Sequence, residues 1–320
     1  MRAIVVREHG GPEVLVPAEV AEPVPGAGQL LVAVEAVGVN FVEAYNRSGH
    51  YPSKPPFTPG GEAAGTVVAV GERVAEFGVG DVVVSTNVRG AYAERALVDA
   101  DRAVRVPEGL GARQAAAALL QGMTAHYLTH ATYPVQPGDA VLVHAAAGGM
   151  GLLLTQLVKV LGGRVIGTVS TAEKERLARE AGADEVVGYD GFPAAVRAFT
   201  GGAGVSAVYD GVGRTTFDGS LESLRRRGTL VLYGAASGPV PPLDPARLQA
   251  AGSVFLTRPT LVDHVVTREE LLARASDVLG WVAAGDLNVH IGRTYPLDSA
   301  GEAHSDLEGR RTTGKVLLIP

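Results

Sequence analysis

The stretch "VLVHAAAGGMG", residues 141–151, joins a β-branched apolar run to a cluster of alanines and glycines. An apolar pattern at helical spacing, "LLLTQLVK", follows it at 152–159. A short apolar run that ends in glycines predicts a buried strand and a turn, and the pattern after it predicts a helix. Strand, glycine turn and helix in this order form the opening unit of a doubly wound parallel sheet.

The turn itself fits the pattern Ala-x-Gly-x-x-Gly, with Ala146, Gly148 and Gly151 at the small-residue positions. In this motif the second small residue lets the backbone approach a pyrophosphate, and the third lets helix and strand pack closely. The phosphates would meet free N–H groups where the helix begins, near Gly149. Alanine at the first position weakens the motif, so a plain tight turn is the competing interpretation.

The chain around this turn alternates strand and helix from residue 137 onward. We expect strands at 140–145, 164–169, 185–188, 205–210 and 229–233, and helices at 149–161, 172–181, 192–199 and 215–226. This alternation requires right-handed crossovers and a parallel sheet, which favours dinucleotide binding over a plain turn. The arginines at 225–227 would end the last of these helices, where cations meet the negative end of its dipole.

The first 110 residues have a different sequence pattern. Short β runs at 30–39, 65–71, 81–84 and 92–98 lie between glycines and prolines. This pattern predicts an irregular β-barrel or sandwich. A helix at 112–131 follows it. Near the C-terminus we expect helices at 268–284 and 298–307 and a last strand at 314–319, which would return to the first domain.

Composition restricts the function further. The 320 residues suffice for two domains, and no apolar run approaches a membrane span. There is no cysteine, which removes disulfides, thiolate nucleophiles and cysteine zinc ligands, and fits a cytoplasmic location. The net charge of −6 argues against a nucleic-acid surface, because phosphate contacts need clustered cations.

The end of the second strand indicates which dinucleotide is bound. A site for NAD usually has an acidic residue there, about twenty positions after the turn, for the ribose hydroxyls. Here Ser170 and Thr171 occupy that place, and Lys174 follows. Hydroxyls and an ammonium suit a 2′-phosphate, so the sequence favours NADPH. An ordinary solvated lysine is the alternative for Lys174, and the nearby Glu173 is a modest objection.

The whole chain resembles the zinc-independent quinone oxidoreductases of the medium-chain dehydrogenase/reductase superfamily, the group that includes ζ-crystallin. The resemblance runs almost end to end. It is carried by "GVNFVEAYNRSGHYP" (38–52), "PGGEAAGTVVAVG" (59–71), "HAAAGGMG" (144–151), "VYDGVG" (208–213), "LTRPTL" (256–261) and "TTGKVLLIP" (312–320).

This resemblance implies an α/β protein with two domains. Residues 1–122 and 260–320 would form a GroES-like β-barrel catalytic domain, and residues 123–259 a Rossmann domain that binds NADP(H). It also implies a homodimer, in which the last Rossmann strands of two subunits, here "SVFLT" (253–257), pair into one sheet.

Zinc-dependent relatives use a cysteine near position 40 and a histidine in a Gly-His-Glu motif. This chain has Asn40 and the sequence Gly60-Gly61-Glu62 in those places, and its histidines show no ligand spacing. Neither asparagine nor glycine replaces a thiolate or imidazole ligand, so we expect no metal. A quinone accepts a hydride without a Lewis acid, and the protein's task is then to position the reactants.

The resemblance also assigns site residues. Asn40, Tyr45 and Tyr51 are the expected catalytic residues, with ordinary loop packing as the alternative for the two tyrosines. The expected cofactor-binding residues are Asn40, Phe41, Tyr45, Thr124, Tyr127, Gly148, Gly149, Met150, Gly151, Ser170, Lys174, Tyr189, Tyr233, Gly234, Ala235, Ala236, Leu256, Arg258 and Arg310. Gly211 and Gln121 stand where relatives often carry polar or basic residues.

The expected activity is NADPH-dependent reduction of a small-molecule quinone. An NADPH-dependent reductase of activated carbon–carbon double bonds, such as enones or enoyl thioesters, is the alternative enzyme. A non-catalytic NADPH-binding or RNA-binding protein is the alternative from another class, and the acidic balance argues against RNA.

Overall fold

The computed structural model describes residues 1–320, which divide into two compact units. The first unit comprises residues 1–121 and 265–320, and the second comprises residues 122–264. Helix α2 (Ala112–Tyr127) carries the chain from the first unit into the second. Each unit has its own apolar core.

The second unit is built on a six-stranded sheet in the order β11-β10-β9-β12-β13-β14, and every neighbouring pair is parallel. Its strands are β9 (Ala140–Val143), β10 (Arg164–Thr168), β11 (Glu185–Val187), β12 (Val205–Asp210), β13 (Leu224–Leu232) and β14 (Phe255–Thr257). The two halves of the sheet run outward from β9 and β12. This is the doubly wound parallel sheet that the alternating pattern predicts.

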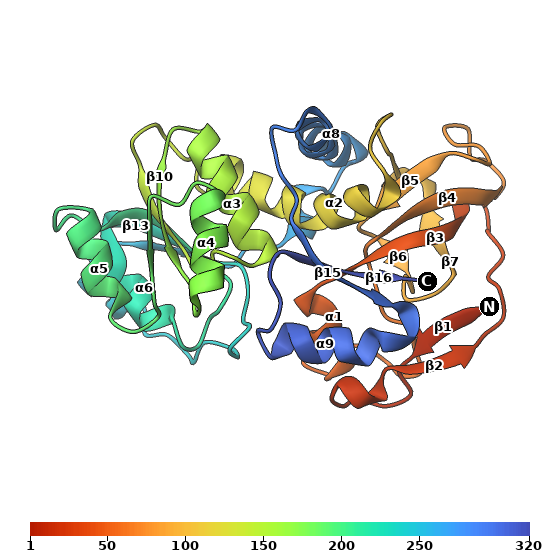
Figure 1. Cartoon of the computed structure of the whole chain (residues 1–320), viewed down its shortest axis with the longest axis horizontal. Coiled ribbons are helices and arrows are strands. Elements are labelled where there is room, and N and C mark those ends of the chain that lie inside the picture. Colours follow the sequence, from red (N-terminus) through yellow and green to blue (C-terminus); the bar gives the residue numbers. More distant parts are fainter. The chain divides into compact units, whose positions relative to one another are not determined.

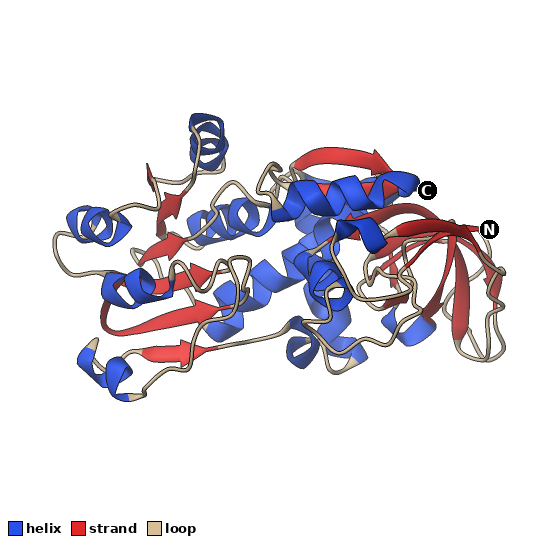
Figure 2. Cartoon of the chain, turned by 90° about the horizontal axis from the view of Figure 1, so that it is seen from below, coloured by secondary structure: helices blue, strands red, loops and turns tan.

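Helices cover both faces of this sheet (Figure 2). Helices α3 and α4 pack together, as do α5 and α6. The helical elements of this unit are η3 (Leu128–Thr132), α3 (Gly149–Val160), α4 (Ala172–Glu180), α5 (Phe192–Phe199), α6 (Phe217–Ser223), α7 (Ala246–Ala250) and η4 (Leu261–His264).

One expectation about this unit is wrong. The arginines at 225–227 do not end a helix, because α6 stops at Ser223 and β13 begins at Leu224. Leu224 is buried in the core, and the three arginines are exposed along the strand. The cluster therefore belongs to the start of β13 and not to the last turn of α6.

The first unit contains an eight-stranded sheet in the order β15-β16-β3-β4-β5-β8, with β7 also paired to β3 and β6 to β7 (Figure 1). Its strands are β3 (Gln29–Val39), β4 (Ala63–Val70), β5 (Val82–Ser85), β6 (Val88–Arg89), β7 (Arg95–Asp99), β8 (Val104–Arg105), β15 (Ile291–Pro296) and β16 (Lys315–Ile319). Separately, β1 (Arg2–Val5) and β2 (Val16–Glu19) form a two-stranded antiparallel sheet. The expected return of the last strand is confirmed, since β16 pairs with β3.

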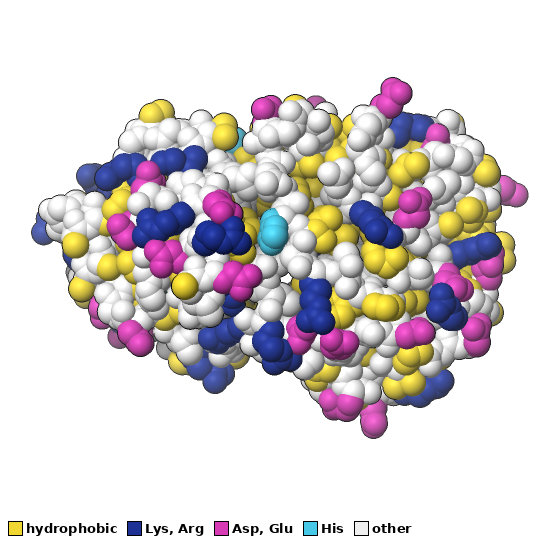
Figure 3. Space-filling model, in the orientation of Figure 1, with side chains coloured by type: hydrophobic (Ala, Val, Ile, Leu, Met, Phe, Trp, Pro, Cys, Tyr) yellow, Lys and Arg dark blue, Asp and Glu magenta, His cyan; other side chains and the backbone are white.

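The remaining elements of the first unit are helical. They are η1 (Pro12–Val14), α1 (Phe41–Arg47), η2 (Ala100–Arg102), α8 (Arg268–Ala284), η5 (Leu297–Ser299) and α9 (Ala300–Glu308). No helix of the protein has the length and apolar character needed to cross a membrane. On the face drawn in Figure 3, basic and acidic side chains are interspersed rather than gathered by sign.

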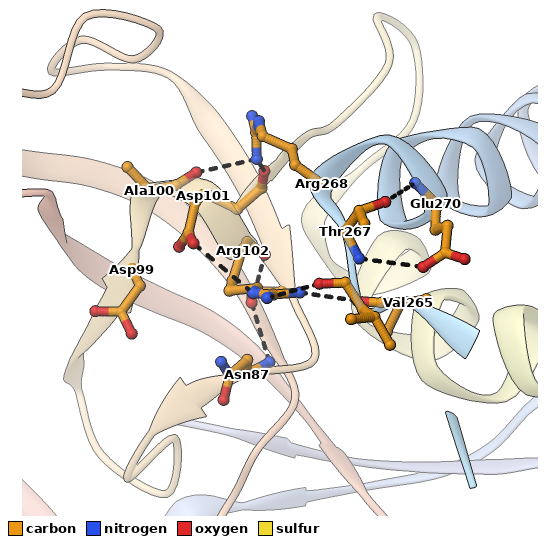
Figure 4. A network of polar contacts seen from close by, with 12 residues as sticks. Asn87, Asp99, Ala100, Asp101, Arg102, Val265, Thr267, Arg268 and Glu270 are labelled. Carbon is orange, nitrogen blue, oxygen red and sulfur yellow. Dashed lines mark hydrogen bonds and ion pairs between the residues drawn. The ribbon is translucent and has the colours of Figure 1, made fainter. Parts of the chain in front are cut away.

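The chain is anchored where it re-enters the first unit (Figure 4). The Arg102 guanidinium donates to the carbonyl oxygens of Val265 and Val266, at 2.8 and 3.1 Å. Immediately afterwards Thr267 caps α8 and exchanges hydrogen bonds with Glu270. These contacts fix the start of the C-terminal segment that supplies α9 and β16.

Candidate active site and cofactor site

The carboxyl edge of the parallel sheet gathers the candidate cofactor residues of the second unit. Residue Val143 of β9 lies opposite Gly167 of β10 on one side and Tyr209 of β12 on the other, so these strands end together. The topology reverses between β9 and β12. Open α/β sheets bind ligands outside such a reversal, at the carboxyl ends of the strands.

The turn after β9 has a backbone that few side chains tolerate. Ala145 adopts φ = 50°, in the left-handed region that favours glycine. A Cβ added at Gly151 would lie 2.3 Å from the Ala145 carbonyl oxygen and 2.6 Å from the Ala146 Cα. Only glycine fits there. Strain and close approach concentrated in one turn are typical of a ligand-binding loop.

Alanine at the first small-residue position of the motif, Ala146, is explained by Gly167 in the neighbouring strand β10. A Cβ added at Gly167 would lie 2.6 Å from the Ala146 methyl, so glycine in β10 leaves the space that this methyl fills. The Ala146 N–H also donates to the Thr168 carbonyl oxygen at 3.0 Å. The departure from the usual glycine is therefore compensated within the adjacent strand.

Helix α3 begins directly after this turn and has no side-chain cap at its N-cap, Gly148. The first N–H groups of a helix have no partner within the helix, so Gly149, Met150 and Gly151 present donors at its positive end. A glycine-lined approach to uncapped amides is an anion cradle. These residues fit the diphosphate of NADP(H).

The end of β10 has no carboxylate in the ribose position. Thr171 is the N-cap of α4, and its hydroxyl accepts from the Lys174 N–H at 3.2 Å. The Thr171 oxygen thus caps α4, while Ser170 and the Lys174 ammonium are the groups assigned to a 2′-phosphate. Ser170 is exposed and Lys174 is half-buried.

The loop after β12 is packed against the end of β13. A Cβ added at Gly211 would lie 2.8 Å from the Tyr233 ring. This explains glycine where relatives often have a polar residue, because the tyrosine ring already occupies that space. The backbone N–H of Ala236 donates to the Gly211 carbonyl oxygen at 3.1 Å, so the segment 233–236 is held beside the loop.

Two ring pairs belong to the same unit. The Tyr127 ring stacks on His264 with centroids 4.1 Å apart and planes 8° apart. The Tyr189 ring lies parallel to the His144 ring, 6.2 Å away. The cofactor residues expected in the second unit are Thr124, Tyr127, Gly148, Gly149, Met150, Gly151, Ser170, Lys174, Tyr189, Tyr233, Gly234, Ala235, Ala236, Leu256 and Arg258.

The first unit carries the other expected residues, and Asn40 is the most constrained of them. Its carboxamide Oδ1 accepts from the Lys315 ammonium at 2.7 Å, and its Nδ2 donates to Glu62 Oε2 at 3.0 Å and to the Gly38 carbonyl oxygen at 3.3 Å. Lys315 also contacts Glu62 Oε2 at 2.6 Å. All of these side chains are buried. The amide orientation of Asn40 is therefore fixed by a lysine and a glutamate.

Glu43 lies beside this cluster in α1 and is buried. Its carboxylate accepts from the backbone N–H of Asn40 at 2.8 Å and of Gly61 at 3.3 Å. Burial raises the pKa of Glu43 to about 7, although the Lys315 ammonium and the backbone donors oppose the shift. Glu43 is thus a carboxyl group that changes charge near neutral pH.

Arg47 anchors the other end of α1. Its guanidinium contacts Glu308 of α9 at 2.7 Å and the ring of His304 at 3.4 Å. His304 also lies 2.8 Å from the Tyr92 hydroxyl, and burial together with Arg47 lowers the pKa of His304 to about 3. These buried contacts fix the helix that carries Phe41 and Tyr45.

Four rings gather along residues 41–51. The Tyr45 and Tyr51 centroids are 5.1 Å apart, and Phe41 lies 6.2 Å from Tyr45. His50 stacks on Tyr51 at 5.5 Å. Such a group offers flat apolar surface to a planar ring, with phenol hydroxyls at its edge. Arg310, the last expected residue in this unit, follows α9 with φ = 57°.

The positions where relatives bind zinc have a different chemistry here. Asn40 belongs to the buried cluster, and Gly61 has no side chain. No group of three or more histidine, cysteine, aspartate or glutamate side chains in the protein could hold a metal ion. A cation is nevertheless present beside Glu62, and it is the ammonium of Lys315.

Known families match both units. The alcohol dehydrogenase GroES-like domain matches residues 26–108, and the zinc-binding dehydrogenase family matches residues 149–278. The quinone oxidoreductase of Salmonella typhimurium is 42% identical over 98% of both chains. The chain belongs to the zinc-independent quinone oxidoreductases of the medium-chain dehydrogenase/reductase superfamily. The expected fold class, a Rossmann sheet domain with a GroES-like domain, is confirmed.

Two further proteins similar to this chain are informative. The mycobacterial protein Rv1454c, solved in complex with NADPH, is 53% identical, covers both chains fully and has a TM-score of 0.98. The 2-haloacrylate reductase of a Burkholderia species is 40% identical over 99% of this chain and 98% of its own.

Sequence reasoning missed several buried groups. Lys315, Glu43 and the pair His144 and Asp210 lie far apart in the sequence, and no spacing rule connects them. The only signal was their context, since Lys315 lies in "TTGKVLLIP" and His144 directly precedes the alanines of the turn.

Proposed function

We propose that this protein reduces quinones at the expense of NADPH, without a metal ion. The observation that carries the proposal is the glycine turn leading into the uncapped helix α3 of the second unit. NADPH is the reductant that, when bound, supplies the hydride equivalent. The family relationship and the NADPH complex of a relative 53% identical support both parts of the proposal.

The cofactor role is assigned to the second unit. Amides of residues 149–151 would bind the diphosphate, while Ser170 and Lys174 would bind the 2′-phosphate. Tyr189 offers a ring for stacking on adenine. The segment 233–236 and Leu256, Arg258, Thr124 and Tyr127 complete the assigned set.

The catalytic role is assigned to the first unit. Tyr45 and Tyr51 would present their rings to the planar acceptor and their hydroxyls to its oxygens. The Asn40 Nδ2 already donates to Glu62 and to a backbone carbonyl. Asn40 stays among the proposed catalytic and nicotinamide-side residues, with its carboxamide oriented by these bonds and its oxygen facing Lys315. Phe41 and Arg310 are assigned to the nicotinamide side and to a cofactor anion, respectively.

The reaction proposed here needs orientation more than activation. Quinones accept hydride readily, so holding the acceptor in one orientation lowers the barrier without a Lewis acid. The protein has no cysteine, and we assign no covalent nucleophile. Water can deliver the proton that completes the hydroquinone.

Reduction of activated carbon–carbon double bonds is the second candidate activity. It is favoured by one observation, the 40% identity to a 2-haloacrylate reductase over nearly the full chain. Both reactions require the same reductant and a planar conjugated acceptor, so the two candidates differ in acceptor and not in cofactor.

Anaerobic oxidation of NADPH, followed by the absorbance of the reduced nicotinamide, is measured with ortho-quinones, para-quinones, enones and 2-haloacrylates to separate the two candidates. We expect kcat/KM for the best quinone to exceed that for the best alkene by at least about tenfold. Faster turnover of an alkene would assign the second candidate activity.

A homodimer and a cytoplasmic location complete the proposal. Strand β14 pairs only with β13, so one edge of the six-stranded sheet is open, and Phe255 in that edge strand is 61% exposed. An open edge of this kind invites pairing with a second copy. Light scattering of the wild type and of Phe255→Lys tests the dimer, and cell fractionation tests the location.

A further inference from the structure

A continuous chain of buried polar side chains runs beneath the carboxyl edge of the parallel sheet. His144 follows β9, and its ring lies 2.9 Å from Thr168 Oγ1 through Nδ1 and 2.9 Å from Ser220 Oγ through Nε2. Ser220 in α6 in turn lies 2.9 Å from Asp210 Oδ2. All four side chains are fully buried. The chain links β9, β10 and β12 with α6.

The carboxylate at one end determines the direction of every hydrogen bond in this chain. Asp210 only accepts, so Ser220 donates to it. The Ser220 oxygen is then left to accept from His144 Nε2–H. A neutral imidazole has one N–H, so Nδ1 accepts from the Thr168 hydroxyl. Thr168 Oγ1 finally accepts from the backbone N–H of Ala145 at 3.3 Å.

The ring of His144 is neutral in this arrangement. Burial lowers its pKa, and the negative charge of Asp210 opposes that shift only in part. The order of groups also distinguishes the cluster from a catalytic triad. The serine proton points to the aspartate and not to the histidine, and none of the groups reaches solvent. Ser220 is therefore not an activated nucleophile.

Both ends of the chain hold loops that carry assigned cofactor residues. At one end is Ala145, the left-handed residue that shapes the pyrophosphate turn. At the other end Asp210 accepts from the backbone N–H groups of Val212 and Gly213, at 2.8 and 2.9 Å, and from the Thr216 hydroxyl. Its carbonyl oxygen accepts from the Tyr233 N–H at 2.9 Å.

We propose that Thr168, His144 and Ser220 are positioning residues, which connect the pyrophosphate turn to Asp210 and hold the two cofactor loops in one geometry. A rigid link of this kind favours the binding-competent loop arrangement before the cofactor arrives. The inference rests on the proposed function only in taking NADPH as the ligand of these loops.

The tautomer of His144 is the first test, and it needs no turnover. Two-bond ¹H–¹⁵N spectra of protein labelled at histidine, assigned by the signals lost in His144→Gln, report which ring nitrogen carries the proton. We expect the neutral Nε2–H form throughout the range from about pH 6 to about pH 8, which includes the ordinary pKa of histidine. In Ser220→Ala the Nε2 partner is absent, so the Nδ1–H form should become populated. A wild-type Nδ1–H form, an imidazolium, or no change in Ser220→Ala overturns the proposal.

The NADPH dissociation constant is the second test. Thr168→Val keeps the shape but removes the hydroxyl, and should weaken NADPH by about five- to tenfold, the range expected for one hydrogen bond. Thr168→Ser keeps the hydroxyl and should remain within about twofold of the wild type. Val196→Ala, in the core of the same unit, controls for lost stability, because Val196 is buried and does not belong to the hydrogen-bonded chain of side chains.

A purely structural role predicts that NADPH affinity falls with melting temperature across all three variants, and that outcome overturns the proposal. Equal affinities of Thr168→Val and Thr168→Ser also overturn it. Failure of the proposed function is distinguishable. If NADPH binds with this hydroxyl dependence but no quinone is reduced, the assigned activity is wrong and the positioning role stands.

Discussion

The Lys315 ammonium lies 2.6 Å from a carboxylate oxygen of Glu62, and neither side chain is more than 1% exposed. The pair joins the last strand of the chain to the residue after the Gly60-Gly61 turn, where zinc-dependent relatives have the histidine-glutamate pair of their motif. Asn40 is hydrogen-bonded to both partners. A lysine from β16 thus supplies the positive charge beside this glutamate.

Removing one charge of this pair should destabilise the protein more than removing both charges. Lys315→Met leaves a buried carboxylate without its cation and should lower the free energy of unfolding by about 3–5 kcal/mol. The double variant Glu62→Gln with Lys315→Met removes both charges and should be less destabilised than Lys315→Met. Urea denaturation measures both. A double variant less stable than the single one would show that the charge pair is not what the lysine satisfies.

Glu43 should make stability depend on pH near neutrality. Its folded-state pKa of about 7 is raised above the ordinary value of 4.5, so the folded state binds the proton more tightly than the unfolded state. Stability from this group is complete below pH 4.5 and is lost as the pH rises through about 7, on the order of 3 kcal/mol in total.

The comparison of wild type with Glu43→Gln isolates this contribution from the other buried groups. His304, with a lowered pKa, acts in the opposite sense, because its stability is lost as the pH falls below its ordinary value. Urea titrations at about pH 5 and about pH 8 lie on either side of the Glu43 pKa of about 7. Between these pH values the free energy of unfolding should decrease less in Glu43→Gln than in the wild type. The same decrease in both proteins would assign it to another group.

Lys174 should determine the preference for NADPH over NADH. Loss of its pairing with a doubly charged phosphate in Lys174→Ala should weaken NADPH by one to two decades, about 1.5–3 kcal/mol, and leave NADH unchanged. Arg176→Ala is the matched control, since Arg176 lies in the same helix and pairs with Glu180. Dissociation constants by fluorescence titration decide the question. Equal wild-type affinities for the two cofactors would contradict the assignment.

Tyr51 should orient the acceptor without acting as an obligatory acid. Tyr51→Phe keeps the ring, and we expect only a modest decrease in kcat/KM because water delivers the proton. Tyr51→Ala removes the surface beside Tyr45 and should cost about 1–3 kcal/mol of transition-state stabilisation. Steady-state kinetics with one ortho-quinone compare the two. If both variants lose several decades, the hydroxyl is the required proton donor.

Much of the fold follows from local sequence signals. The alternation after residue 137 predicts the parallel sheet, and α5, α8 and β12 begin and end where the pattern predicts. The expected helix at 215–226 is too long because leucine and arginine fit either structure. Strand pairing places Leu224 in the sheet, because it lies opposite Val205 of β12. The helix therefore ends before it.

The site was predictable only where a motif is contiguous. The turn at 146–151 could be predicted from its motif. The alanine at its first small-residue position is explained by Gly167 of β10, which the fold brings close to the Ala146 methyl. Lys315 and Asn40 are 275 positions apart, and Ser220 and His144 are 76 apart. Such contacts arise from topology, and a single sequence does not contain them in readable form.

Turnover of metal-stripped protein is the most direct test of the central claim. After prolonged chelation, with elemental analysis to verify removal, anaerobic NADPH oxidation by an ortho-quinone is measured beside the untreated protein and with NADH in place of NADPH. We predict unchanged quinone-dependent turnover with NADPH, and slower turnover with NADH. A stoichiometric zinc whose removal abolishes the reaction, or no quinone-dependent oxidation of NADPH at all, would contradict the account.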